Sequence, residues 1–416
     1  MAQSSTFVLQ RQSIGISDTL DVTFQGDDSE PIPGRFVVWS TGVLWLEATA
    51  YLAEKSLEVR TTGGSEETVA SHASSLAVFA TYLEDSGRSW IELPPEKDQR
   101  VTYLYRGHLI DRVEKQKKLR RSTAARHISV VKSFYKWAKA KGLLTGLSDA
   151  YKPRPRGVAY TNSVGLVQVK EVESSDLAIS SSSAKNSGVE DGLHPLKIQD
   201  RNSMILLVKE HFSREFYLIL MLGFYSGMRI ETILGLTVKG LQNTFPSREL
   251  HGWLSLEVGG HSGIPTKRNV NYFPSIPQWL FNELLNYIKR PRRAVRAKKA
   301  EGADKGLVFL GQRGQKLTNK SFCQDMRKLK SLAKMKGFNF ESFYFHCSRA
   351  TFGTALVTML MTDKAPTPYI LNCLRCCMGH TNASTSLRYV QWVEDDSERV
   401  VVANLYSEFL GFPHET

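Results

Sequence analysis

Apolar residues recur at helical spacing along much of the first 150 residues. One stripe follows steps of four and three, the period of an amphipathic helix: Val69, Ala73, Leu76, Ala80 and Leu83. Ser65, which two glutamates follow, is a typical helix start, and Gly87 is a typical helix end. The pattern therefore predicts a helix over residues 65–87.

A second stripe predicts a helix over Ser122–Gly142. Its buried face would consist of Ile128, Val131, Phe134 or Tyr135, and Ala138. With the preceding helix, this stripe indicates a helical domain over residues 37–150. Residues 1–36 contain one strand-like stretch, LDVTFQG, and we treat them as an extension of unknown role, for which a contact with another protein is one interpretation.

The helical period is lost between residues 151 and 194. Glu173–Gly188 is rich in serine and has no apolar period, which is typical of an interdomain linker, while the alternation in Val164–Val172 would add a short strand. Regular patterning resumes near Pro195 and predicts a second domain over 195–416. Its longest apolar run, Phe216–Tyr225, is shorter than the roughly 20 residues that a membrane-spanning helix needs.

The charge is unevenly distributed along the 416 residues. The chain has a formal net charge of +13, and residues 101–160 contain 15 Lys/Arg but only three Asp/Glu, whereas residues 1–35 carry a net charge of −3. An excess of positive charge indicates a polyanionic partner, either nucleic acid or a membrane surface. A charged helix is often only a solvated surface, but such helices usually mix both signs, so we favour a phosphate-facing surface. Its candidate DNA-binding residues are Lys117, Lys118, Arg120, Arg121, Arg126, Lys132, Lys136 and Lys139.

The five cysteines do not indicate a disulfide framework. Their number is odd, and the N-terminus lacks the charged and then apolar pattern of a signal peptide, so we expect a soluble protein of a reducing, cytoplasmic compartment. Cys373, Cys376 and Cys377 lie together, but no second Cys/His pair stands at zinc spacing, and buried free thiols are common. We therefore expect no metal.

Four separate fragments of the second domain carry residues suited to phosphate chemistry. In GFYSGMRIE, Arg229 follows a break in the long apolar helix, where a guanidinium needs an anionic partner, although a structural carboxylate would also serve. In GIPTKRNVNYFP, alternation after a glycine-rich bend predicts a hairpin with Lys267 near its turn, a position where lysine is usually surface decoration.

The other two fragments lie nearer the C-terminus. In FHCSRATFG, His346 and Arg349 are three residues apart and would share one edge of a helix. In CCMGHTNASTSLRYVQ, a turn at His380 precedes a helix that brings Tyr389 round after one or two turns. A histidine or a tyrosine in such places often only packs in the core.

Taken in order, the four fragments resemble the signature of the tyrosine recombinase (phage integrase) family. That signature is an Arg after a Gly-hydrophobic pair, a hairpin Lys, an H-x-x-R helix, and a Leu-Gly-His turn with the nucleophilic Tyr nine residues later. The resemblance extends to residues 37–150, which are similar to the family's core-binding domain. It implies a mainly α fold with a small β-hairpin or sheet, arranged as a two-domain, C-shaped DNA clamp.

The resemblance also implies a reaction and its residues. Tyr389 would attack a DNA phosphodiester, forming a 3′-phosphotyrosyl link and a free 5′-hydroxyl without ATP, metal or other cofactor. Arg229 and Arg349 would stabilise the charge on the non-bridging oxygens, and His380 would donate a hydrogen bond to them. His346 and Lys267 would move protons, in an order that the sequence leaves open.

The sequence departs from the family pattern at supporting positions. Thr232 stands three residues after Arg229, where the family usually has Glu or Asp, while Glu231 lies one residue earlier. Cys-Ser follows His346 where Asp-Leu is common, and Met378 replaces the usual leucine. These changes affect the geometry of the site more than the kind of chemistry.

The expected function is site-specific recombination of double-stranded DNA at core sites, by a homotetramer on two sites, for a mobile element. A C-terminal amphipathic helix with Val401, Leu405 and Phe409 on one stripe would dock on a neighbouring protomer. Such a protein would be cytoplasmic and nucleoid-associated, with no membrane partner. The alternatives are a type IB topoisomerase-like enzyme that relaxes DNA alone, and a non-cleaving DNA-binding protein with the same fold.

Overall fold

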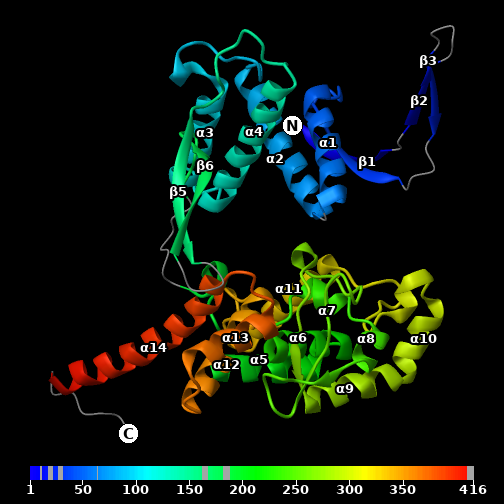
Figure 1. Ribbon diagram of the computed structural model, residues 1–416, viewed down its shortest axis with the longest axis vertical. Coiled ribbons are helices and arrows are strands. Elements are labelled where there is room, and N and C mark those ends of the chain that lie inside the picture. The colour runs from blue at the N-terminus through cyan, green and yellow to red at the C-terminus, as the bar shows by residue number, and fades with distance from the viewer. Residues whose placement is uncertain are drawn as a thin grey trace. The chain divides into compact units, whose positions relative to one another are not determined.

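The computed structural model describes residues 1–9, 12–16, 22–26, 31–62, 64–161, 167–180 and 188–409. The side chains of residues 12–26 and 397–409 lie outside this description, so the predicted stripe of Val401, Leu405 and Phe409 does as well. The chain divides into two compact units. Unit 1 contains residues 1–158 and 169–183, and unit 2 contains residues 159–168 and 184–416. Helices predominate in both units, and the strands form small antiparallel sheets (Figure 1).

Unit 1 is built on four helices, of which the apolar pattern predicted α2 and α4 individually: α1 (Leu46–Thr62), α2 (Glu66–Ser86), α3 (Val101–Glu114) and α4 (Arg121–Ala140). The expected limits of α2 are confirmed, because the Ser65 side chain accepts from the Glu67 backbone N–H and Gly87 adopts the left-handed conformation, φ 62°. All the apolar positions predicted for α4 are buried, including both Phe134 and Tyr135. Their rings pack with that of Trp45 into an aromatic core.

The N-terminal residues are partly built into unit 1. Strand β1 (Gln3–Leu9) pairs antiparallel with β4 (Ile32–Val38), and β2 (Gln12–Ile16) pairs with β3 (Val22–Gly26). Ala2 and Val37 are buried in the aromatic core of unit 1. The strand expected in LDVTFQG corresponds to β3.

The segment predicted as a linker has more structure than its serine content indicates. It contains the antiparallel pair β5 (Pro153–Thr161) and β6 (Val167–Ser175). Beyond β6, Leu177 and Ile179 are buried in unit 1, whereas Val189 and Leu193 are buried in unit 2. A few apolar side chains thus anchor the segment to both units, although they are too sparse to form a period.

Unit 2 surrounds an almost fully buried helix, α6 (Arg214–Ser226), which follows α5 (Ile198–His211). Two short helices come next, α7 (Ile230–Leu234) and α8 (Val238–Gln242). A three-stranded antiparallel sheet then has the order β7 (Phe245–Pro246), β8 (Trp253–Ser255), β9 (Ser275–Pro277). The expected hairpin is the β8–β9 pair, which a bridge between Val258 and Tyr272 extends.

The rest of unit 2 is helical: α9 (Gln278–Lys289), α10 (Pro291–Lys299), α11 (Asn319–Met335), α12 (His346–Thr362), α13 (Thr367–Met378) and α14 (Ala383–Phe409). Helix α12 approaches α6 closely at Gly223, where an added Cβ would lie 2.4 Å from Ser348 Oγ. None of the described helices is long and apolar enough to cross a bilayer.

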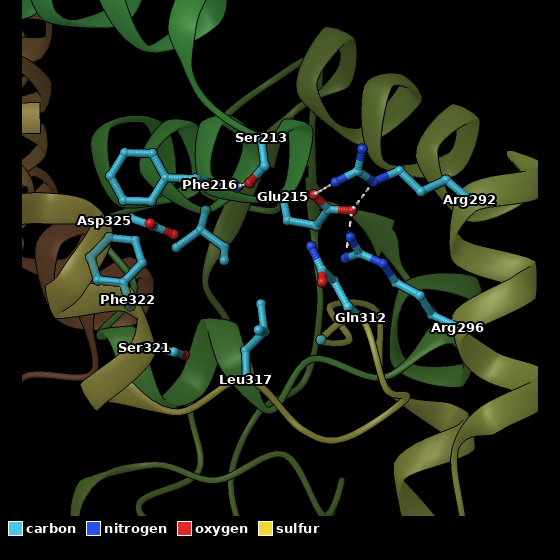
Figure 2. A pocket seen from close by; sticks show the side chains of 12 residues that line it. Ser213, Glu215, Phe216, Arg292, Arg296, Gln312, Leu317, Ser321, Phe322 and Asp325 are labelled. Carbon is cyan, nitrogen blue, oxygen red and sulfur yellow. Dashed lines mark hydrogen bonds and ion pairs between the residues drawn. The ribbon is translucent and has the colours of Figure 1, made fainter. Parts of the chain in front are cut away.

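A buried carboxylate fastens α10 to the centre of unit 2. Glu215, near the start of α6, accepts hydrogen bonds from Arg292 Nε at 3.0 Å and Tyr287 Oη at 3.1 Å, and Arg296 Nη1 lies 2.8 Å away. Figure 2 shows the carboxylate between the two guanidiniums, at one side of a pocket of about 270 Å³. Part of the basic run of residues 289–299 therefore neutralises an internal acid.

Candidate active site

The first predicted arginine is placed by a sharp end of α6. Gly227 ends the helix in the left-handed conformation, φ 63°, and an added Cβ there would lie 2.5 Å from Phe352 Cδ1. Only glycine fits this turn without strain. The chain then reaches Arg229, the N-cap of α7, whose Nη2 donates to Glu190 Oε1 at 3.0 Å.

The second arginine ties three distant fragments of the chain together. Arg349 lies in the first turn of α12 and is fully buried. It donates from Nε to Glu190 Oε2 at 2.7 Å, from Nη1 to the Gly227 carbonyl at 2.8 Å, and from Nη2 to the Met378 carbonyl at 2.7 Å. Because a guanidinium presents its donors in a rigid fork, these bonds fix the turn before Arg229 and the turn before His380 against each other.

The last fragment supplies a stacked histidine and tyrosine. Gly379, φ 64°, ends α13, and His380 follows with Nδ1 2.9 Å from Ser386 Oγ and Nε2 3.5 Å from Glu190 Oε2. The His380 ring stacks on that of Tyr389, with centroids 5.7 Å apart. Tyr389 is fully buried and donates its hydroxyl to Glu190 Oε2 at 3.2 Å.

Four of the six predicted site residues therefore surround one carboxylate, which the sequence analysis did not identify. Glu190 lies in η2 (Glu190–Gly192), a single 3₁₀ turn at the end of the predicted linker. Arg229, Arg349, His380 and Tyr389 all contact it. An acid beside a serine-rich stretch carries no periodicity or motif, so nothing in the sequence pointed to this position.

The electrostatics of the cluster favour a charged Glu190 and a neutral Tyr389. Burial by itself would raise the pKa of Glu190, but the contact with His380 and the charge of Arg349 outweigh it and hold that pKa far below its ordinary value. Burial, and then the negative charge of Glu190, raises the pKa of Tyr389 well above that of a free phenol. Burial also lowers the pKa of His380. In this arrangement the phenol is protonated and is a donor.

Tyr272, which the hairpin alternation only assigned to a strand, also borders the cluster. Its ring packs on the turn at Gly379, where an added Cβ would lie 2.7 Å from the ring. The charges of Arg349 and Arg229 act on its hydroxyl, whose pKa burial nonetheless raises. Within the described residues the hydroxyl is buried with no hydrogen-bond partner, and so are the Thr232 hydroxyl and His380 Nε2.

The other two predicted residues lie differently. Lys267 is exposed in η3 (Lys267–Asn269), where Arg268 and Asn269 have positive φ, and no contact of its side chain with the other five is found among the described residues. His346 begins α12 and is half-buried. It lies one turn before Arg349 and so leaves the helix from the same edge.

The candidate DNA-binding residues of unit 1 lie on α4 and the loop before it. All are exposed except Lys132, which is half-buried. Arg121 donates to the Ser180 carbonyl at 2.9 Å and lies 3.5 Å from Glu114, and Lys139 pairs with Asp149. Most of the expected surface is thus exposed to solvent, and Arg121 and Lys139 also have internal partners.

The cysteines are dispersed between core and surface. Cys373 and Cys377 are buried, and burial raises the pKa of both, to about 12 for Cys377, so both are protonated thiols. In the described part of the chain, no group of three His, Cys, Asp or Glu side chains is arranged to hold a metal ion.

Comparison with known proteins identifies unit 1 most directly. Residues 57–142, from within α1 to the end of α4, match the family model of the phage integrase, N-terminal SAM-like domain. Over these residues the chain is similar to that domain of the phage integrases. A search of the curated proteins finds no sequence match.

The fold of this chain is similar to that of solved integrases. A structure of the Tn1549 transposon integrase in complex with a circular intermediate DNA superposes with a TM-score of 0.50 at 15% identity, covering 82% of this chain and 96% of that one. A lambda integrase dimer bound to a COC′ core site gives 0.49 at 12% identity, covering 82% and 94%. XerA recombinase gives 0.33 at 14% identity, covering 83% and 91%. At such identities the likeness to the Tn1549 integrase shows a shared fold.

Proposed function

We propose that this protein is a site-specific recombinase that cuts and rejoins double-stranded DNA through a covalent bond to Tyr389. The observation that carries the proposal is the convergence of Arg229, Arg349, His380 and Tyr389 on one anion, the Glu190 carboxylate. Two guanidiniums, an imidazole and a phenol around one negative charge form a site suited to a phosphate. The integrases with the same fold were solved in complex with DNA.

In the proposed reaction, the Tyr389 oxygen attacks the scissile phosphorus as the bond to the 5′-oxygen breaks. The phosphate stays on the 3′-oxygen of the cut strand and is now also bonded to the Tyr389 oxygen. The 5′-hydroxyl of a second strand then attacks this phosphate and releases the tyrosine, so the bond energy is conserved. Arg229 and Arg349 stabilise the charge that develops on the non-bridging oxygens. Each such donor is worth roughly 3–4 kcal/mol in comparable anion holes.

Protons must move in both directions during this step. The pKa of Tyr389 is raised, so the phenol needs a base during attack, and the leaving 5′-oxygen needs an acid. We assign these roles to His346 and Lys267, and His380 donates to the phosphate from Nε2. Exposed Lys267 would have to approach when DNA binds, because its turn lies outside the cluster in the free protein.

We further propose that the basic surface of α4 holds the DNA backbone, so that the two units form a clamp on a core site. Recombination joins two sites, which implies a tetramer in which α14 docks on the neighbouring protomer. The chemistry as written requires neither metal nor ATP. A mobile element that integrates or excises is the setting that fits these features.

The decisive experiment uses a nicked suicide substrate that contains a core site, located by footprinting the protein on the ends of candidate elements. The wild-type protein should become covalently attached to the DNA, and Tyr389→Phe should bind equally but not attach. If neither protein attaches to a footprinted site, the non-cleaving interpretation is correct. If the wild-type protein relaxes supercoiled DNA of any sequence as a monomer, the topoisomerase-like interpretation is correct.

A further inference from the structure

Glu190 occupies the centre of the candidate active site but does not come from a catalytic fragment. Its two oxygens accept from Arg229, Arg349 and Tyr389, and Oε2 lies 3.5 Å from His380 Nε2. These are the groups that the proposed reaction assigns to the scissile phosphate and its attacking oxygen. The single O–H of Tyr389 and the single N–H at His380 Nε2 cannot serve a phosphate and this carboxylate at the same time.

The surroundings of Glu190 contain more donors than a carboxylate can satisfy. The Tyr272 hydroxyl is buried at the edge of the cluster without a hydrogen-bond partner among the described residues, and His380 Nε2 has only the 3.5 Å approach to Glu190 Oε2. Buried donors are normally paired, so leftover donors in one cluster indicate a larger acceptor. A phosphodiester has two charged non-bridging oxygens and two bridging ones, and it would satisfy more of these donors than two carboxylate oxygens do.

The turn that carries Glu190 is a single 3₁₀ turn with a buried apolar residue on each side. In η2 the Val189 backbone N–H donates to the Leu193 carbonyl at 2.9 Å, and these two apolar side chains are buried in the core of unit 2. Fourteen residues earlier, Asp176 accepts from Tyr103 and Lys97 of unit 1. Glu190 thus lies in unit 2 on a single 3₁₀ turn and not on one of the helices that carry the catalytic fragments, so a change of its side-chain rotamer would withdraw the carboxylate without unfolding those helices.

We propose that Glu190 is a built-in substitute for the scissile phosphate, which keeps the DNA-free enzyme inactive until bound DNA displaces it. The carboxylate neutralises Arg229 and Arg349 and accepts a hydrogen bond from the Tyr389 hydroxyl, so the nucleophile is held protonated and its partners are occupied. The inference rests on the proposed function. In this proposal Glu190 has a regulatory role, because it neutralises the positive charges of Arg229 and Arg349 only in the absence of DNA.

The first test needs no DNA and uses inorganic phosphate as the probe. In Glu190→Gln the arginine pair lacks its counter-charge, so phosphate should bind there and raise the melting temperature of unit 2. The wild-type protein should show no comparable shift. Glu210→Gln, the same charge change at an exposed position of α5, is the matched control and should behave as wild type. Equal shifts in all three proteins would overturn the proposal.

The second test measures covalent attachment to the suicide substrate. Glu190→Gln should attach about tenfold faster than wild type at subsaturating DNA, and the difference should shrink at saturation because the DNA displaces the carboxylate by mass action. Glu190→Gln should also bind this DNA more tightly than wild type does. That difference in affinity should disappear on DNA with a neutral methylphosphonate at the scissile position. Slower attachment by Glu190→Gln would instead make Glu190 a positioning residue. If the wild-type protein does not attach to the DNA, the proposed function is refuted. The phosphate-binding test alone then decides whether Glu190 occupies an anion-binding site.

Discussion

The Tyr389 ring lies directly against Gly353 of α12. A Cβ added at Gly353 would lie 2.4 Å from Cε1 and 2.7 Å from Cδ1 of that ring, closer than real Cβ contacts. The glycine thus lets the helix that begins with the H-x-x-R fragment approach the helix that carries the proposed nucleophile. The position of the phenol thus depends on the last glycine of the FHCSRATFG fragment, to which the sequence analysis gave no role.

Gly353→Ala should therefore displace the phenol. We expect covalent attachment to fall by about 10²-fold, since a shift of about 1 Å costs that much in an oriented reaction. The added methyl should also destabilise unit 2 by about 1–3 kcal/mol through overpacking. Attachment to the suicide substrate and urea unfolding would measure these effects.

The matched control is Gly107→Ala on α3, where an added Cβ meets nothing within 4 Å. Alanine in an open helical position should leave attachment unchanged and raise stability by about 0.4–1 kcal/mol. If Gly353→Ala attached as quickly as Gly107→Ala, Tyr389 would not need its observed position to react.

Tyr272→Phe should slow covalent attachment to DNA without lowering the free energy of unfolding. The hydroxyl has no hydrogen-bond partner among the described residues, so its removal should leave the free energy of unfolding unchanged or slightly increased. If the hydroxyl donates to the scissile phosphate, attachment should slow by about 10²-fold.

Tyr287→Phe should show the opposite result, a lower free energy of unfolding with covalent attachment unchanged. Its hydroxyl donates to buried Glu215 at 3.1 Å, far from the proposed nucleophile in the sequence and outside its cluster of contacts. We expect a loss of about 1–3 kcal/mol of stability, because a buried acceptor loses a partner, with attachment unchanged. Unchanged attachment by Tyr272→Phe would remove Tyr272 from the proposed site.

The sequence predicted the elements that depend on local patterns. The limits of α2 followed from its cap residues and stripe, and the order of the four fragments was enough to group Arg229, Arg349, His380 and Tyr389. Arg229 and His380 lie at turns, and Arg349 and Tyr389 lie within the first two turns of α12 and α14. The resemblance to the family signature grouped them without knowledge of the tertiary fold.

The features that sequence reasoning missed depend on contacts between distant segments. Glu190 reaches Arg349 across 159 positions of the chain, and the residues around it show no period. The alternation that predicted the hairpin placed Tyr272 on a strand. It could not predict the pairing of Tyr272 with Val258, nor that the Tyr272 ring packs against Gly379. Thr232, noted as a departure from the family's acid, is buried with an unpartnered hydroxyl, and the acid that pairs with Arg229 comes from Glu190.

Glu215→Gln should show how strongly the pocket of Figure 2 supports unit 2. The glutamine removes the negative charge between Arg292 and Arg296, of which Arg296 is almost fully buried. Breaking a buried ion pair by changing one partner costs about 3–5 kcal/mol. Urea unfolding followed by hydrogen exchange in peptides of α6 and α10 would detect this loss.

Glu283→Gln is the comparison for Glu215→Gln. Glu283 pairs with Arg214 near the surface, with a side-chain exposure of 41%, and such exposed pairs contribute only about 0–1 kcal/mol. A loss of the same size in both variants would mean that the Glu215 cluster behaves as a surface ion pair.

Unit 1 should lose stability as the pH falls from neutral towards 4. Burial lowers the pKa of His127, on α4, to about 4, and it also lowers the pKa values of His72 and His108. In the unfolded chain a histidine has a pKa of about 6.5. Between these values the unfolded state binds more protons than the folded state, so acid favours unfolding and full stability is present only above about pH 6.5.

His127→Leu should flatten this dependence, because the leucine is apolar and His127 Nδ1 has no hydrogen-bond partner among the described residues. We expect the free energy of unfolding of unit 1, measured by hydrogen exchange in α4 peptides at pH 7.5 and 5, to fall less in the variant than in wild type. Unit 2 of the same molecules serves as an internal reference, because the substitution should not alter its pH dependence. An unchanged slope for unit 1 would show that His127 already binds a proton in the folded state near neutral pH, and that its burial does not exclude one.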